Sequence, residues 1–165
     1  GYDEIFINNI GQSNKLFKIR ENGLLEKIAL KNAALSNGFG TGAAVADIDK
    51  DGILELLISN GESFKQSLNL FKANIKANFS YLRIKPVTNY NAPARGATVI
   101  LKSNLRTHAK TIDAGSGYLC QMEPVAHFGI REGEKDLEVS IKWTDGKNQS
   151  FKIREINKEI IVKKE

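Results

Sequence analysis

The chain repeats a short sequence pattern, and this repeat restricts the possible folds more than any other feature of its 165 residues. Residues 1–9 (GYDEIFINN) align with residues 52–60 (GILELLISN). Each run has a glycine three residues before a glutamate, then an apolar stretch, then an asparagine. The segments that follow also match, with NKLFK at 14–18 and NLFK at 69–72. A period of about 50 residues predicts repeated β-sheet blades or a solenoid.

The first half contains several strand-like segments. They are short, apolar and bounded by Gly, Asn or Ser, as in the strands of a propeller, and they comprise residues 4–9, 14–20, 41–48, 55–60 and 68–73. Residues 26–36 are compatible with a short helix. Because residue 1 aligns with residue 52, we expect the chain to begin inside a loop of a larger protein. Its blades would then be partial, and their open edges would need a partner.

The second half has the pattern of a separate β domain. Seven segments have strand character, namely residues 81–88, 97–103, 107–114, 125–130, 136–143, 149–156 and 158–163. Val139, Ile141 and Trp143 alternate with polar residues, and Asp145-Gly146 then supplies the turn residues of a hairpin.

The boundary between the halves is predicted near residues 74–79, which gives one domain over 1–76 and another over 77–165. The predicted fold class is all-β. Partial β-propeller blades, with a loop between two of their strands that is described below, are followed by a small β-sandwich or barrel-like domain.

Composition and charge exclude several classes of protein. With 41% apolar and 26% charged residues the chain is globular, and it has no apolar run of the roughly 18 residues that a membrane helix needs. Residues 1–75 carry 8 basic and 9 acidic side chains, whereas residues 76–165 carry 16 and 10. The basic residues are scattered singly and lack interleaved aromatics, so we predict no nucleic-acid binding. The single cysteine, Cys120, excludes a disulfide within the chain and leaves a buried thiol or pairing with a cysteine outside it.

The most specific motif is an acidic loop over residues 47–55 (DIDKDGILE). Asp47, Asp49, Asp51 and Glu55 stand at positions 1, 3, 5 and 9, and the carbonyl of Ile53 at position 7 can point inward. Hard oxygen ligands in this number suit Ca²⁺ better than Mg²⁺, which keeps its waters and demands a strict octahedron. The loop is therefore predicted to bind calcium and to hold two strands in place.

Two alternatives to this calcium loop can be weighed from the sequence, and the first of them does not fit. An EF-hand needs an acidic residue at position 12, where this chain has Ile58, and a helix on each side, where it has strand-like segments. An Asp-rich turn without a bound ion is the simpler alternative, because Asp and Gly favour turns on their own. Glu4 is the repeat equivalent of Glu55 but cannot form a site alone.

No catalytic arrangement stands out. Asp113, Ser116 and His127 suggest a hydrolase, but a nucleophile elbow needs glycine two residues on each side of the serine, where Ala114 and Tyr118 stand. We therefore predict no enzyme. A carbohydrate-binding or biosynthetic accessory protein is the alternative, and it would need a pocket with paired carboxylates that the sequence does not show.

The chain resembles two known families over nearly its whole length. The acidic loop and its flanking strands resemble the FG-GAP/VCBS repeat of integrin-type propellers. The second half resembles the ASPIC/UnbV domain through residues 94–99 (ARGATV), 113–120 (DAGSGYLC), 122–130 (MEPVAHFGI) and 143–146 (WTDG).

This resemblance implies a secreted, extracellular, calcium-associated protein that contacts the matrix or a cell-surface receptor. It also implies that the first half packs against the remaining propeller blades of the whole protein. It implies no catalysis and no membrane insertion. In a secretory pathway Asn78 and Asn148 would be glycosylation acceptors, each in an Asn-x-Ser triplet.

Overall fold

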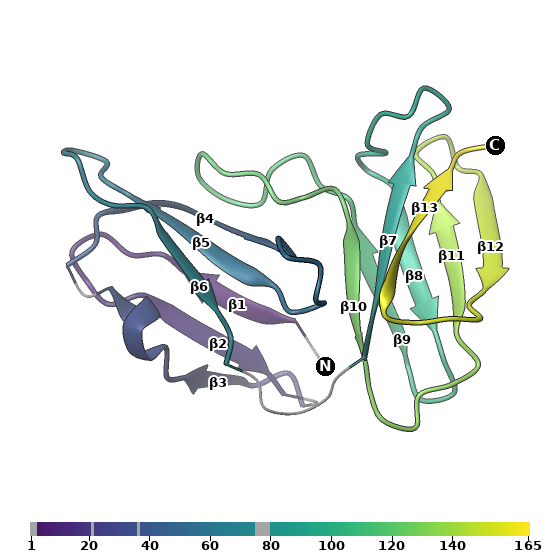
Figure 1. Ribbon diagram of the computed structural model, residues 1–165, viewed down its shortest axis with the longest axis horizontal. Helices are drawn as coiled ribbons and strands as arrows, with labels where there is room; N and C mark the ends of the chain where they lie inside the picture. Colours follow the sequence, from purple (N-terminus) through teal and green to yellow (C-terminus); the bar gives the residue numbers. More distant parts are fainter. Residues whose placement is uncertain (1–2, 21, 36, 75–79) are drawn as a thin grey trace. The chain divides into compact units, whose positions relative to one another are not determined.

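The computed structural model describes residues 3–20, 22–35, 37–74 and 80–165. These residues form strands and one short 3₁₀ helix, so the predicted all-β class is confirmed. The chain divides into two compact units (Figure 1). The first takes in the described residues of 1–49, 53–74 and 115–121, and the second those of 50–52, 75–114 and 122–165. The predicted boundary after residue 76 and the triplet at Asn78 lie outside the described residues and stay predictions.

The first unit holds two antiparallel sheets in which the strand order follows the chain (Figure 1). The first sheet consists of β1 (Glu4–Ile7), β2 (Lys15–Ile19) and β3 (Leu25–Ile28). The second consists of β4 (Gly40–Ala46), β5 (Glu55–Asn60) and β6 (Asn69–Lys72). Consecutive antiparallel strands of this kind also make up the blades of β-propellers, in which each sheet has about four strands.

The helix considered for residues 26–36 is wrong. Strand β3 occupies its first part, and only the 3₁₀ helix η1 (Lys31–Ala34) follows before Leu35 adopts a left-handed φ of 42°. Leu, Glu and Lys are good helix formers, but β3 pairs with β2, with Lys27 opposite Phe17. Pairing with a neighbouring strand thus overrides the weak local preference of this segment.

The side chain of Asn8 connects the two sheets. Its Nδ2 donates to the carbonyl oxygen of Gly42 at 3.0 Å and to that of Ser59 at 3.3 Å. Beside it, the backbone N–H of Gly40 donates to the carbonyl of Asn9 at 3.0 Å. Residue 40 has room only for glycine, because a Cβ there would lie 2.1 Å from Asn8 Oδ1. These contacts fix the first sheet against the end of the second.

The second unit is a sandwich of two sheets. One has the order β12-β11-β8-β9 and the other β10-β7-β13, with β13 parallel to β7. The bounds are β7 (Ser80–Val87), β8 (Thr98–Lys102), β9 (Thr107–Thr111), β10 (Ala126–Ile130), β11 (Glu138–Lys142), β12 (Asn148–Lys152) and β13 (Lys158–Lys163). All seven strands predicted for this half are present. Both sheets have edge strands, so among the described residues they form a sandwich and no closed barrel.

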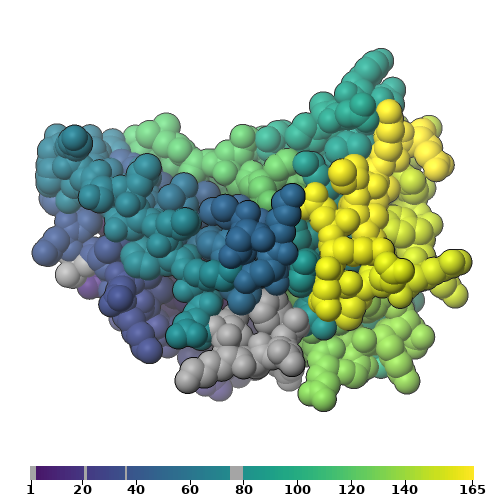
Figure 2. Space-filling view, viewed as in Figure 1, coloured from purple at the N-terminus to yellow at the C-terminus, as the bar shows by residue number. Residues whose placement is uncertain are grey.

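The core of this unit lies between its two sheets. Side chains from both inner faces are buried together, among them Leu82, Ile84, Val99, Leu101, Phe128, Val139, Ile141 and Trp143. The predicted apolar face of β11 is therefore confirmed, as is the hairpin through Asp145-Gly146, where Gly146 has a φ of 87°. Strand β13, in yellow in Figure 2, lies at the surface, where Ile161 is 62% exposed.

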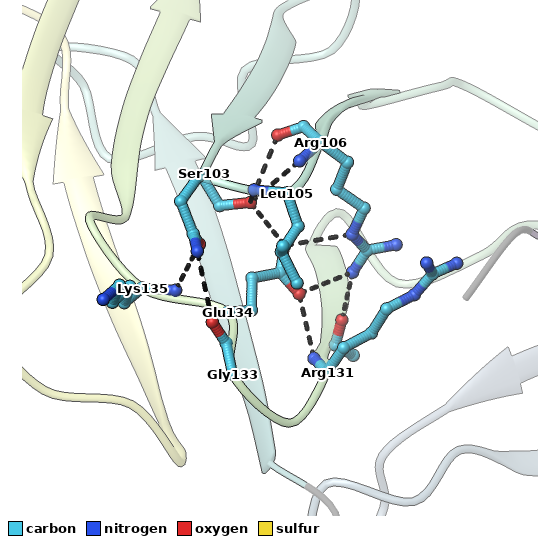
Figure 3. A network of polar contacts seen from close by, with 9 residues as sticks. Ser103, Leu105, Arg106, Arg131, Gly133, Glu134 and Lys135 are labelled. Carbon is cyan, nitrogen blue, oxygen red and sulfur yellow. Dashed lines mark hydrogen bonds and ion pairs between the residues drawn. The ribbon is translucent and has the colours of Figure 1, made fainter.

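A buried ion pair stabilises the loops of the sandwich (Figure 3). Arg106, just before β9, donates from Nε to Glu134 Oε1 at 3.0 Å. Glu134 also accepts from the Ser103 hydroxyl at 2.9 Å and from the backbone N–H of Arg131 at 2.9 Å. Burial alone would raise the pKa of Glu134, but these hydrogen bonds and the charge of Arg106 outweigh it and hold the pKa below its usual value.

Candidate metal centre

The acidic loop joins β4 to β5 and therefore lies between two strands, not between two helices. This arrangement supports the sequence-based rejection of an EF-hand. The loop turns sharply, with left-handed φ angles of 62° at Lys50 and 85° at Gly52. Glycine adopts such an angle without strain, which explains its place at the sixth position.

Three of the predicted ligands lie together. Asp47, Asp49 and Glu55 each offer a carboxylate oxygen, and these oxygens lie within 4.8 Å of one another. Asp47 and Glu55 are each 5% exposed, whereas Asp49 is exposed. Asp51 is exposed and is not part of this group, and Ile53 is half-buried in the same loop. Their roles as ligands stay predictions.

The carboxylate of Glu55 is held in position by the loop itself. Its Oε2 accepts a hydrogen bond from the backbone N–H of Ile48 at 2.8 Å. Its Oε1 is buried, accepts no hydrogen bond, and faces the ammonium of Lys72 at 3.2 Å. The backbone N–H of Ile48 thus fixes one carboxylate oxygen of Glu55, and the other oxygen faces the positive charge of Lys72.

Lys72 is a member of this site that sequence reasoning missed. Its Nζ lies 2.5 Å from Asp49 Oδ2 as well as 3.2 Å from Glu55 Oε1. Lys72 stands directly opposite Glu55 in the pairing of β6 with β5, just as Lys18 stands opposite Glu4 in the pairing of β2 with β1. A comparison of the two repeats as paired strands would have revealed this lysine.

The donor chemistry of the loop fits a calcium ion. Calcium takes six to eight hard oxygen ligands and combines carboxylates with backbone carbonyls and waters. Asp47, Asp49 and Glu55 would supply three of these oxygens, and a buried Glu55 oxygen without a hydrogen bond is what a ligand position requires. Within the described ranges, no other group of three or more His, Cys, Asp or Glu side chains converges in this way.

A second pair of residues that sequence reasoning did not connect lies on the first unit. Tyr118, in the segment 115–121, donates its hydroxyl to Glu62 Oε1 at 3.2 Å. The negative charge of Glu62, and then this hydrogen bond, raise the pKa of Tyr118. Nothing in the sequence places these residues together, since they are distant along the chain.

Comparison with known proteins identifies the class of both halves. Residues 1–58 match the family model of the FG-GAP-like repeat, and residues 87–165 match that of ASPIC and UnbV. Each of these two segments thus matches the family that its sequence resembles, which confirms that resemblance.

At the level of individual proteins, the chain is similar to cartilage acidic protein 1. It is 45% identical to the Homo sapiens protein over 153 residues, which is 87% of this chain and 23% of that protein. The Mus musculus and Xenopus tropicalis proteins are each 44% identical over 87% of the chain and 24% of their own length. The chain thus spans about a quarter of the length of these curated relatives. No helix in the described part of the chain has the length and apolar character needed to cross a membrane.

Proposed function

We propose that this chain is a calcium-binding module in which the ion holds the blade formed by β4, β5 and β6. The observation that carries the proposal is the convergence of Asp47, Asp49 and Glu55 within 4.8 Å, two of them buried. Carboxylates brought this close repel one another, and a divalent cation removes the repulsion. Asp51 and the carbonyl of Ile53 complete the proposed ligand set.

We propose that the loop binds calcium with modest affinity. Extracellular calcium modules have dissociation constants on the order of 10⁻⁴ to 10⁻³ M. The nearby ammonium of Lys72 favours the weak end of this range, because it already neutralises part of the negative charge of the loop. Calcium would act structurally, by fixing the angle at which β4 enters β5.

We further propose that the module is extracellular and non-enzymatic, and that it presents a surface to the matrix or to a cell-surface receptor. The support is its similarity to cartilage acidic protein 1, whose name refers to cartilage. Secretion would also make Asn148, an exposed residue at the start of β12, available for glycosylation.

The remaining blades of a longer protein are the other proposed partner. The relatives are about four times as long as the aligned segment. Apolar side chains of the two blade-like sheets are exposed here, including Ile5 and Ile7 on β1 and Leu70 on β6, at 41%, 41% and 55%. Burying such a surface against neighbouring blades would be favourable.

Thermal unfolding with and without calcium tests the proposed function. A ligand at 100 times its dissociation constant stabilises the folded state by about 2.7 kcal/mol, so millimolar calcium should raise the melting temperature of the wild-type chain. Asp49→Ala should abolish most of this rise, whereas Asp113→Ala, outside the loop, should retain it. An unchanged melting temperature of the wild type would favour the Asp-rich turn without an ion.

A further inference from the structure

The ammonium of Lys72 occupies the position of a cation among the carboxylates of the acidic loop. Its Nζ contacts Asp49 Oδ2 at 2.5 Å and Glu55 Oε1 at 3.2 Å. The side chain of Lys72 is 34% exposed and that of Glu55 is 5% exposed, so the lysine approaches from solvent toward a buried acid. An ion pair with one buried partner is stronger than a fully exposed pair, because water screens it less.

A metal ion and this ammonium cannot hold the same oxygens at the same time. Calcium lies about 2.3–2.6 Å from its carboxylate oxygens. The lysine nitrogen already stands at a comparable distance from Asp49, and two positive charges this close repel strongly in a partly buried site. Binding of the metal therefore requires Lys72 to leave.

We propose that Lys72 is an internal counter-ion that keeps the blade stable without metal and competes with calcium for the loop. This inference rests on the proposed calcium binding and concerns its regulation. The flexible side chain of lysine, with its compact charge, suits such an exchange, since it can swing into solvent when displaced. The competition lowers the apparent calcium affinity and makes the blade less dependent on the ion for folding.

The internal repeat supplies a matched control. Lys18 stands opposite Glu4 in the same register, but Glu4 is exposed and belongs to no acidic group within the described residues. If both lysines only supported strand pairing, substituting either one would affect calcium affinity in the same way. If Lys72 competes with the metal, only substitution at residue 72 changes the calcium affinity.

Isothermal titration with CaCl₂ of the wild type, Lys72→Met and Lys18→Met tests the proposal, with melting temperatures measured in EDTA. Methionine keeps the long apolar stem and removes the charge. We expect Lys72→Met to bind calcium about tenfold more tightly than the wild type and to melt lower in EDTA. Lys18→Met should match the wild type in affinity. Equal calcium affinities of the wild type and Lys72→Met would refute the proposed competition by Lys72. The proposed calcium binding itself would still stand.

Amine labelling of the wild type provides a readout that needs no variant. Acetic anhydride modifies exposed lysines, and mass spectrometry measures each site. Calcium should increase the acetylation of Lys72 several-fold and leave Lys18 unchanged. An unchanged Lys72 in calcium-bound protein refutes the displacement. The absence of calcium binding by both the wild type and Lys72→Met would instead refute the proposed function, so the two failures are distinguishable.

Discussion

Arg106 and Glu134 form an ion pair that joins the segment before β9 to the loop after β10. Arg106 Nε lies 3.0 Å from Glu134 Oε1, and the side chain of Glu134 is only 1% exposed. The same carboxylate accepts hydrogen bonds from Ser103 and from the backbone of Arg131 (Figure 3). Two connections far apart in the sequence are thus held by one buried charge.

Substitution of Glu134 by glutamine should destabilise the protein by about 3 kcal/mol, because removing one partner of a buried pair leaves the other charge uncompensated. Glu155→Gln is the control, since its ion pair with Lys158 is exposed, is screened by water and should contribute little to stability. Urea unfolding measures both. Equal effects of the two substitutions would contradict the role given to burial.

The contribution of Glu134 should also depend on pH. The pKa of Glu134 in the folded protein lies below its usual value, whereas in the unfolded chain the pKa of this glutamate is about 4.3. Between these two values the unfolded state binds a proton that the folded state does not, so the free energy of unfolding rises with pH. The stabilisation is therefore complete above about pH 5 and is lost as pH falls through the folded pKa. Urea midpoints from pH 3 to pH 7 should show the difference between the wild type and Glu134→Gln shrinking in acid. A constant difference would be inconsistent with this linkage.

The link between the two sheets of the first unit makes a separate prediction. Asn8→Ala removes hydrogen bonds to the carbonyls of Gly42 and Ser59 and should cost about 1–3 kcal/mol. Asn9→Ala is the matched control, because its amide donates only to Ser13 within the same exposed turn. Thermal unfolding compares them, and a larger loss for Asn9→Ala would argue against the link.

Gly40 and Asn8 should behave as a coupled pair. Alanine at residue 40 would place its Cβ 2.1 Å from Asn8 Oδ1 and displace that amide. Gly40→Ala and Asn8→Ala therefore lose the same hydrogen bonds, and the double variant should be less destabilised than the sum of the two by at least about 0.5 kcal/mol. Chemical unfolding of the four proteins gives this coupling, and strict additivity would contradict the contact.

Most strands could be predicted from the sequence because one physical pattern specifies them. In β11, Val139 and Ile141 alternate with polar residues, since one face of the strand meets the core and the other meets water. Strand β3 was missed because its four residues have no buried face: Leu25 is 56% exposed. Only the position of β2 beside it makes this segment a strand.

The acidic loop was predictable for a different reason. Its ligand pattern is local, so Asp47, Asp49 and Glu55 could be placed from their spacing alone. Lys72 could not be placed from spacing, because it reaches the loop through the pairing of β6 with β5, and only a comparison of the two repeats as paired strands would have indicated it. Spacing along the chain carries no information about a partner on the next strand.

A crystal structure of the wild-type chain grown with millimolar CaCl₂ tests the calcium site most directly. We expect an anomalous density peak bound by the carboxylates of Asp47, Asp49 and Glu55, with about six to eight oxygens around it and with Lys72 turned into solvent. The same carboxylates around ordinary water, with Lys72 still in contact with Asp49 and Glu55 and no anomalous peak, would contradict the proposal.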